Sequence, residues 1–253
     1  MAFRYFIKMA YDGTYYHGWQ IQPNGHSVQE EMEKVLGWME RKAVAVTGAG
    51  RTDTGVHALE MYAHVDLDTP VEQKKDEWLQ QINHKLSTGI VVNDIIRVND
   101  TAHARFDAIS RTYNYFINTR KDPFSDRYAW LWYGELNIDM MNEGAVRLLG
   151  EHDFKSFSKV HTDVTNFLCT VYASAWTMEQ SQLLFSIKAN RFLRNMVRAI
   201  VGTLLDLGRG HITLKEFDSI IATRHRSAAG MSVPAKGLFL THIEYPDNIW
   251  FAL

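Results

Sequence analysis

The stretch Gly48-Ala49-Gly50-Arg51-Thr52-Asp53-Thr54-Gly55-Val56-His57-Ala58 lies between two predicted strands, Ala43–Val46 and Leu59–Asp66. Its three glycines allow the backbone to turn sharply and to approach a ligand closely. Arg51 and Asp53 are two residues apart, so both side chains can face one side of an extended loop. A neighbouring cation favours the ionised carboxylate and orients it, which suits a nucleophile. The alternative is a surface turn in which Asp53 bonds its own backbone and Arg51 is solvated.

Strands and helices are predicted on both sides of this loop. In the N-terminal part we expect strands at Tyr5–Tyr11 and Asn93–Val98 and helices at Val28–Met39, opened by the capping box Ser27-Val28-Gln29-Glu30, and Asp76–Leu86. In the C-terminal part we expect strands at Arg111–Asn118, Val171–Met178, Leu183–Ala189 and Leu238–Tyr245, and helices from Asp139 to Gly150, Phe192 to Leu207 and Thr213 to His225. Neighbouring strands with irregularly placed helices favour an α+β fold with mostly antiparallel sheets.

The sequence changes character near Ala102–Phe106, which predicts two halves, 1–104 and 105–253. The length of 253 residues fits one large or two ordinary domains, and 46% apolar residues exclude a largely disordered chain. Apolar stretches reach only about ten residues, so we expect no membrane span, and the N-terminus shows no secretion signal. The single cysteine, Cys169, excludes an internal disulfide and a cysteine-ligated zinc site, and fits the cytoplasm.

Basic residues are clustered although the net charge is −2. What an RNA phosphate experiences is the local field, so a basic groove is compatible with this total. One cluster contains Arg105, Arg111, Arg120 and Lys121, and another contains Lys188, Arg191, Arg194, Arg198 and Arg209. On the predicted helix, three of these arginines (191, 194 and 198) would form one stripe. The stripe is either a solvated helix face or a ridge toward RNA phosphates, and Arg198 could instead pair with a carboxylate in a pocket.

Tyr113 and Tyr115 alternate on one predicted strand and so face the same side of it. Such aromatic residues usually belong to a core, but an exposed one beside basic residues can stack on an unpaired base. The chain lacks the HExxH pattern, the Gly-x-Ser-x-Gly elbow and the P-loop ending, which argues against zinc hydrolysis, serine hydrolysis and P-loop nucleotide binding.

Short segments with specific composition follow one another along nearly the whole chain. They are Tyr11–Thr14, His17–Gln20, Ser27–Glu30, Gly50–Ala58, His103–Ala108, Arg111–Tyr115, Glu151–Phe154, Lys188–Asn190, Met196–Arg198 and Ala235–Leu238. In this order they closely resemble the TruA family of tRNA pseudouridine synthases, whose signature loop is similar to Gly50–Ala58. The resemblance implies the pseudouridine synthase fold: a mixed, mostly antiparallel sheet in two α/β halves with a central cleft.

The resemblance also implies roles for individual residues. Asp53 matches the catalytic aspartate, Arg51 precedes it in the signature, Tyr113 matches the tyrosine that stacks on the target uracil, and Arg198 matches the arginine that pairs with the aspartate. Residues expected to bind RNA are Arg105, Arg111, Lys188, Arg191 and Arg194. We expect no metal and no cofactor, because the isomerisation needs neither a redox change nor a group donor.

The expected activity is conversion of uridine to pseudouridine in the anticodon stem-loop of tRNA, at positions 38, 39 and 40, by a cytoplasmic homodimer. Whether Asp53 attacks C1′ or removes the 2′ proton is open. One alternative is a non-catalytic RNA-binding protein or tRNA chaperone on the same fold. Another is a synthase that modifies a different RNA or position.

Overall fold

The computed structural model describes residues 2–159 and 165–251. The chain divides into two compact units, Met1–Ile109 with Leu240–Leu253, and Ser110–Phe239. This differs from the predicted halves, because the C-terminal strand groups with the N-terminal unit. There, Ile243 N–H donates to Glu60 at 3.0 Å, and Ile109 N–H donates to the Glu244 carbonyl at 2.8 Å. The fold is α+β with mostly antiparallel strands, as predicted.

The sheet of the first unit is ordered β4-β1-β3-β10, with β2 beside β3. Its strands are β1 (Phe3–Tyr11), β2 (Thr47–Gly48), β3 (His57–Leu67), β4 (Ile90–Arg97) and β10 (Leu238–Glu244). The central strand β1 pairs antiparallel with both β3 and β4, and Ile7 lies opposite Ala63 on one side and Ile95 on the other. Five of the nine residues of β1 are buried, which is typical of a central strand.

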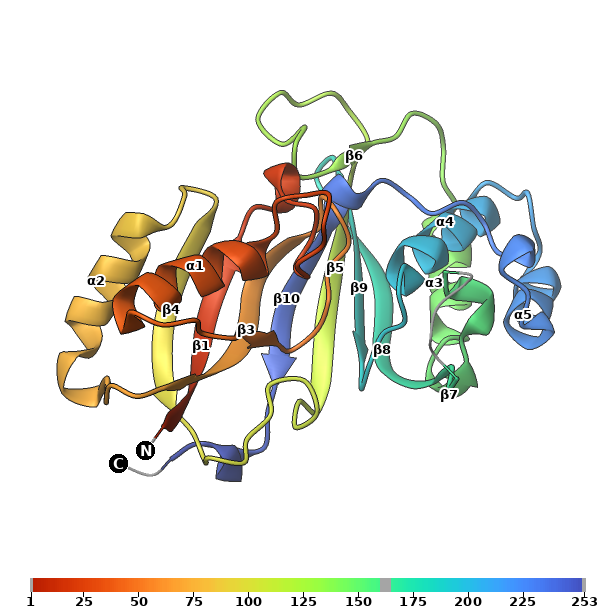
Figure 1. Ribbon diagram of the computed structural model, residues 1–253. Helices are drawn as coiled ribbons and strands as arrows, with labels where there is room; N and C mark the ends of the chain where they lie inside the picture. The colour runs from red at the N-terminus through yellow and green to blue at the C-terminus, as the bar shows by residue number, and fades with distance from the viewer. Residues whose placement is uncertain (1, 160–164, 252–253) are drawn as a thin grey trace. The chain divides into compact units, whose positions relative to one another are not determined.

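Two helices cover this sheet, α1 (Val28–Glu40) and α2 (Lys75–Lys85). In Figure 1, α1 crosses in front of β1 and β3, and α2 lies beside β4. As predicted, Ser27 caps α1, and its hydroxyl accepts the Glu30 N–H at 3.2 Å. The apolar face of α1 places Met32 and Leu36 in the core.

The second unit has a sheet ordered β5-β9-β8-β7, with the short β6 parallel to β5. Its strands are β5 (Ser110–Asn118), β6 (Trp130–Leu131), β7 (Gly150–Asp153), β8 (Leu168–Glu179) and β9 (Gln182–Ala189). The predicted hairpin between β8 and β9 is confirmed, with Glu179 opposite Gln182. The sequence analysis missed β6 and β7, which are only two and four residues long.

The helices of the second unit are α3 (Ile138–Val146), α4 (Met196–Gly208) and α5 (Leu214–Thr223). α3 packs against β8 and α4 (Figure 1). The predicted capping box of α5 is present: Thr213 accepts the Glu216 N–H, and the Glu216 carboxylate accepts the Thr213 N–H. Short 3-10 helices lie at Gly13–Tyr15, Glu72–Lys74, Lys155–Phe157, Arg226–Ala228, Ala235–Gly237 and Asp247–Ile249.

Several predicted elements differ in their bounds: β4 and β8 each begin three residues earlier than predicted, and the helix predicted to reach Gly150 ends at Val146. Three further differences concern one strand and two helix N-termini. The strand expected at Ala43–Val46 is found at Thr47–Gly48, because the backbone of Val46 instead bonds side chains of α1, accepting from Gln29 and donating to Glu33. The helix expected from Phe192 begins only at Met196, because Asn195 adopts a left-handed conformation, with φ 68°. The cap of α3 is Asn137, and Asp139 lies in the first turn.

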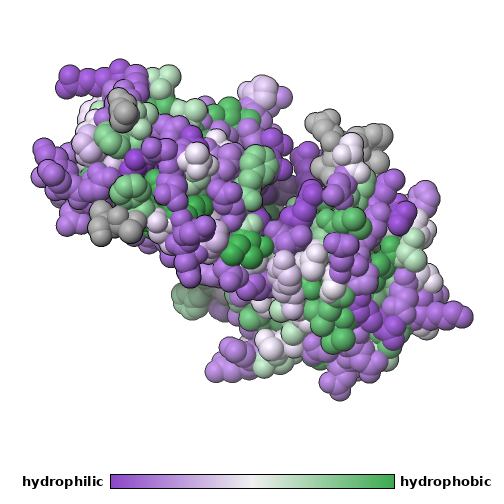
Figure 2. Space-filling view, turned by 90° about the horizontal axis from the view of Figure 1, so that it is seen from below, coloured by the Kyte–Doolittle hydropathy of each residue, from purple (hydrophilic) through white to green (hydrophobic). Residues whose placement is uncertain are grey.

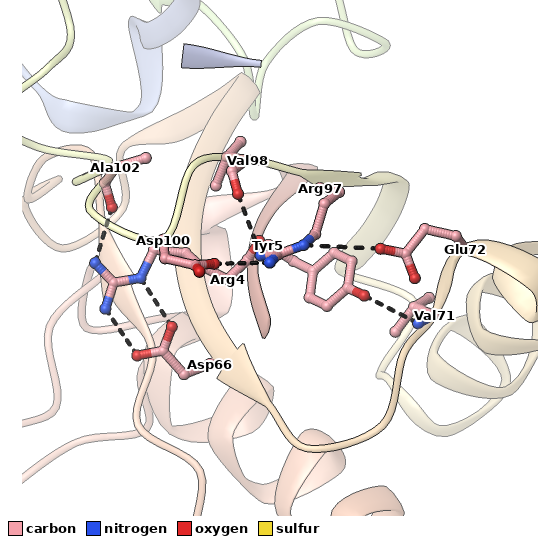
Figure 3. Close-up of polar contacts among 9 residues, drawn as sticks. All are labelled: Arg4, Tyr5, Asp66, Val71, Glu72, Arg97, Val98, Asp100 and Ala102. Atoms are coloured by element: carbon pink, nitrogen blue, oxygen red, sulfur yellow. Dashed lines mark hydrogen bonds and ion pairs between the residues drawn. The ribbon is translucent and has the colours of Figure 1, made fainter. Parts of the chain in front are cut away.

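Two arginines hold β1, β3 and β4 together near one end of the first unit (Figure 3). Arg4 donates to both carboxylate oxygens of Asp66, at 2.8 and 2.7 Å, and to the Ala102 carbonyl at 3.0 Å. Arg97 donates to the Val98 carbonyl at 3.1 Å and to Asp100 at 2.7 Å. The segment that follows β4 is therefore fixed to the sheet by side chains.

The surface drawn in Figure 2 is largely hydrophilic, and its hydrophobic residues form small separate groups. Within residues 2–159 and 165–251, none of the helices combines the length and the apolar character needed to cross a membrane.

Candidate active site

The loop between β2 and β3 is held by the segment that follows β1. Trp19 N–H donates to the Thr52 carbonyl, and Gly55 N–H donates to the Tyr16 carbonyl, both at 3.3 Å. The hydroxyls of Tyr11 and Thr52 lie 3.0 Å apart in a buried contact. The two segments are thus joined by main-chain and side-chain bonds on both sides of Asp53.

Close packing of the two segments requires glycine at position 18. A Cβ atom on Gly18 would lie 2.3 Å from the Thr52 carbonyl oxygen, and its φ of +85° disfavours any other residue. Within the loop itself, Gly55 has a φ of +78°, whereas a Cβ on Gly50 would meet nothing within 4 Å. The sharp turn predicted from three glycines therefore depends on Gly55, and Gly50 is not sterically required.

Arg51 and Asp53 flank the buried Thr52, whose side chain points inward to Tyr11. Arg51 is exposed and Asp53 is half-buried. The main chain turns immediately after Asp53, where Val56 N–H donates to the Asp53 carbonyl at 3.1 Å. Asp53 thus lies on a loop with a defined course and remains partly accessible to solvent, an arrangement that suits a carboxylate acting on a large substrate.

His57 fixes the end of the loop where β3 begins. Its ring is buried, and Nδ1 accepts the Gly13 N–H at 3.1 Å and lies 3.0 Å from the Asp12 carboxylate. Asp12 in turn accepts both the N–H and the hydroxyl of Thr14. The turn after β1 is consequently joined to the first residue of β3.

A buried carboxylate also supports the segment that follows β1. Glu31 on α1 accepts the Tyr16 hydroxyl at 2.9 Å and the Ser87 N–H at 2.6 Å, and lies 3.0 Å from a ring nitrogen of His26. Burial alone would raise the pKa of the Glu31 carboxyl, but hydrogen bonds from Ser87, Tyr16 and His26 outweigh it and lower the pKa. Glu31 therefore stays ionised and ties Tyr16 to α1.

In the second unit, Tyr113 lies on β5 and is half-buried. Its ring meets that of Phe192 edge to face, with centroids 5.0 Å apart and planes at 82°. Tyr115, two residues on, is fully buried, and its hydroxyl donates to the Pro234 carbonyl at 2.8 Å. The two tyrosines share a strand face as predicted, but Tyr115 belongs to the core.

Arg198 is half-buried in the first turn of α4. Its Nε donates to the Val233 carbonyl at 2.7 Å, and Val233 N–H donates to the Arg198 carbonyl at 3.2 Å. Because Tyr115 bonds the next carbonyl, Pro234, the segment at 233–234 connects β5 with α4. Tyr113 and Arg198 are therefore positioned by one framework within this unit.

The predicted helical stripe of arginines is wrong. Arg191 and Arg194 precede α4 and lie in the segment between β9 and that helix, and only Arg198 is helical. Lys188 lies on β9 opposite Thr112, and Arg111 donates to the Asn190 carbonyl at 2.8 Å. Arg111 and Lys188 therefore lie near the same ends of β5 and β9 but on opposite faces of the sheet, because Arg111 is opposite Ala189 and Lys188 is opposite Thr112.

The remaining predicted residue, Arg105, lies in the first unit with Arg51 and Asp53. Sequence reasoning did not assign the roles of Tyr11, Tyr16, Trp19 and Thr52 in holding the loop. Tyr11 and Trp19 lie in the motifs Tyr11–Thr14 and His17–Gln20, each of which combines an aromatic residue with a glycine, and Thr52 lies in the loop Gly50–Ala58. In the described part of the chain, no three His, Cys, Asp or Glu side chains gather as a group that could hold a metal ion.

Comparison with known proteins identifies the family. A family model for tRNA pseudouridine synthase matches residues 145–246. The chain is 49% identical over 249 residues to tRNA pseudouridine synthase A of Bacteroides fragilis, covering 98% of each protein. It is 47% identical over 251 residues to that of Porphyromonas gingivalis, covering 98% of this chain and 99% of the relative. It is 38% identical over 244 residues to that of Bacillus subtilis, covering 95% of this chain and 98% of the relative. With such similarity over nearly its full length, the chain belongs to the tRNA pseudouridine synthase A family and is an isomerase that forms pseudouridine in tRNA.

Proposed function

We propose that this isomerase acts on the anticodon stem-loop of tRNA, converting the uridines at positions 38, 39 and 40, with Asp53 as its catalytic carboxylate. The observation that carries the proposal is the clamped loop, which is bonded at Thr52 and at Gly55, on either side of Asp53. A carboxylate held in this way loses little conformational freedom when substrate binds.

The reaction itself accounts for this requirement. The N1–C1′ bond of uridine breaks, the uracil turns, and C5 joins C1′; C5 then loses its proton and N1 gains one, so the product is an isomer and no oxidation state changes. An ionised Asp53 would either attack C1′ or remove the 2′ proton to give a glycal. Both routes need the same carboxylate at the same sugar, so a loop held at Thr52 and Gly55 serves either of them.

Tyr113 and Arg198 are proposed to complete the site from the second unit. Arg198 would pair with Asp53 and keep it ionised, its guanidinium oriented by the bond from Nε to Val233. Tyr113, supported by the ring of Phe192, would stack on the uracil after it leaves the helix. Unstacking a base costs a few kcal/mol, which such contacts offset. Arg51 would contribute positive charge next to Asp53.

The RNA is proposed to lie along basic residues of both units, in the cleft between the two halves expected for this family. These residues are Arg105, Arg111, Lys188, Arg191 and Arg194. Their guanidinium and ammonium groups would bind phosphates and release counterions, so they set affinity and not sequence preference. We propose that the working form is a cytoplasmic homodimer.

The decisive experiment compares Asp53→Asn with the matched control Asp76→Asn, which replaces an exposed acid on α2. Each protein is mixed with unmodified tRNA transcripts, and pseudouridine is mapped chemically at each uridine. Asp53→Asn should bind tRNA within a few-fold of the unaltered protein but slow the reaction by at least about 1,000-fold. Asp76→Asn should behave as the unaltered protein.

Two results would overturn the proposal. Turnover by Asp53→Asn at an ordinary rate would remove Asp53 from the chemistry. Modification outside positions 38 to 40 would leave an active synthase with a different target.

A further inference from the structure

The segment that follows β4 presents an aromatic ring to solvent. The side chain of Phe106 is 74% exposed. Its ring lies on that of His103, with centroids 4.2 Å apart and planes tilted by 32°. The guanidinium carbon of Arg105 is 5.7 Å from the centroid of the same ring.

The turn that carries Phe106 is held by hydrogen bonds among its own residues. His103 Nδ1 accepts the N–H groups of Arg105 and Phe106, at 3.2 and 3.3 Å. The main chain of His103 is bonded twice to Asp107, since its N–H donates to the carboxylate at 2.7 Å and its carbonyl accepts the Asp107 N–H at 3.0 Å. The turn is closed on itself, so the direction of Phe106 is set by the fold.

The turn is also anchored to the sheet beneath it. The buried His64 on β3 contacts the His103 ring at 4.5 Å between centroids, and its Nδ1 accepts the Ala104 N–H at 3.1 Å. The Ala104 carbonyl accepts the Tyr245 hydroxyl at 2.6 Å. The rings of His64, His103 and Phe106 thus form a column from the interior to the surface.

The column and the loop of Asp53 belong to the same unit. His64 pairs with Thr47 across β3 and β2, and Thr47 is six residues before Asp53. Six extended residues span at most about 20 Å. This bounds the distance between the Cα atoms of Thr47 and Asp53, so a stem-loop with its target nucleotide at Asp53 would have to extend along this unit to place another base over Phe106.

We propose that Phe106 is a stacking platform for an unpaired nucleobase of the tRNA substrate, with His103 fixing the plane of its ring and Arg105 facing the adjoining phosphate. Single-stranded RNA is recognised by aromatic rings combined with positive charge, and this is what the turn presents. A protein partner would need a contiguous apolar patch, whereas Phe106 has a cation and a histidine as neighbours. The inference rests on the proposed function in that the ligand is an RNA loop.

The test measures binding of unmodified anticodon stem-loop RNA to full-length protein in the Asp53→Asn background, so that no turnover intervenes. Phe106→Ala should weaken binding by about 5- to 100-fold, the equivalent of one lost base stack. Phe106→Trp should restore it to within about twofold. Phe251→Ala is the matched control, because Phe251 is also exposed and also has a guanidinium, that of Arg97, 5.4 Å from its ring.

An abasic scan identifies the stacked nucleotide. Each loop nucleotide is replaced in turn by an abasic one, and affinity is measured for the Asp53→Asn protein with and without Phe106→Ala. The proposal requires one position whose loss weakens binding only when Phe106 is present. The proposal would be overturned if the abasic scans of the two proteins had the same profile. It would also be overturned if Phe106→Ala changed the affinity of the Asp53→Asn protein by less than twofold.

These experiments distinguish failure of the proposed function from failure of the stacking proposal. If the protein with Asp53 intact binds the stem-loop but forms no pseudouridine in it, the proposed function fails while the scan still decides the role of Phe106. If the RNA is not bound at all, both are refuted.

Discussion

Protonation of His64 should destabilise the first unit as the pH falls below neutrality. Its Nδ1 accepts the Ala104 N–H, so an added proton there must break that bond. Burial, together with the positive charges of Arg4 and His103, lowers the pKa of His64 from 6.5 to about 4; the carboxylates of Asp66 and Asp107 act in the opposite direction but are outweighed. The perturbation that tests this is His64→Asn, which keeps an acceptor in place and removes the titration.

The size of the effect follows from the two pKa values. Between pH 6.5 and 4 the unfolded chain holds a proton that the folded protein does not, so the free energy of unfolding decreases as the pH falls. The complete loss is about 3 kcal/mol, and about 2 kcal/mol of it should appear between pH 7 and pH 5. Above pH 7 both states are neutral at this residue, and the contribution is fully present.

The assay is urea unfolding of the unaltered protein and of His64→Asn at several pH values from 5 to 8. Groups that do not interact with His64 titrate equally in both proteins, so the difference between the two free energies reports on His64 together with its coupling to its charged neighbours. From pH 7 to pH 5, the free energy of unfolding of the unaltered protein should fall by about 2 kcal/mol relative to that of His64→Asn. A constant difference, or an NMR titration midpoint of His64 near 6.5, would refute the reasoning.

Two further substitutions test the clamp and a helix cap. Gly18→Ala should lower activity by at least about tenfold, because the added Cβ would lie 2.3 Å from the Thr52 carbonyl oxygen; Gly50→Ala, with nothing within 4 Å, should leave activity unchanged. Equal pseudouridine formation by the two variants would contradict the claim that close packing at Gly18 positions the loop of Asp53. Thr213→Ala removes the cap of α5 and should lower the free energy of unfolding by about 1 kcal/mol, measured by urea denaturation; a loss below about 0.3 kcal/mol would show that the capping box contributes little.

Local signals in the sequence were sufficient where a few adjacent residues determine the structure. The capping box at Thr213 was predicted correctly because the capping side chain and its partner lie three residues apart; at Ser27 only the bond from the Glu30 N–H is present, since the Glu30 carboxylate pairs with His26. The strands β5 and β9 were also predicted from local composition; burial alternates with period two along β9, whereas in β5 it does so only near Tyr115 to Ile117.

Prediction failed where distant residues decide the backbone. Ala43–Val46 has strand composition, but Glu33 and Gln29 bond its last residue from α1. Phe192 to Asn195 continues an apolar helical period, yet Asn195 adopts φ 68° and the helix starts after it. Helical spacing could not reveal that Arg191 and Arg194 lie outside the helix. The prediction of one stripe assumed that all three arginines were helical.

The candidate site was only partly accessible from sequence. The family resemblance pointed to Asp53 and to the motifs around it, and the structure shows how Tyr16 and Trp19 hold that loop in place. The bonds that do this join residues more than 30 positions apart, so composition and periodicity carry no sign of them. The pairing of Asp53 with Arg198 and the stacking of Tyr113 stay predictions for the experiments above.

The grouping of residues 240–253 with the N-terminal unit has a consequence for biosynthesis. The edge of β3 that pairs with β10, and the Glu60 side chain that accepts the Ile243 N–H, gain these partners only when β10 has been made, long after the rest of that unit. At about 5–20 residues per second, roughly 7–27 s of translation separate Ile109 from Glu244. During that interval part of one edge of β3 has no partner strand, a stage at which a chaperone or the early folding of the inserted second unit would limit aggregation.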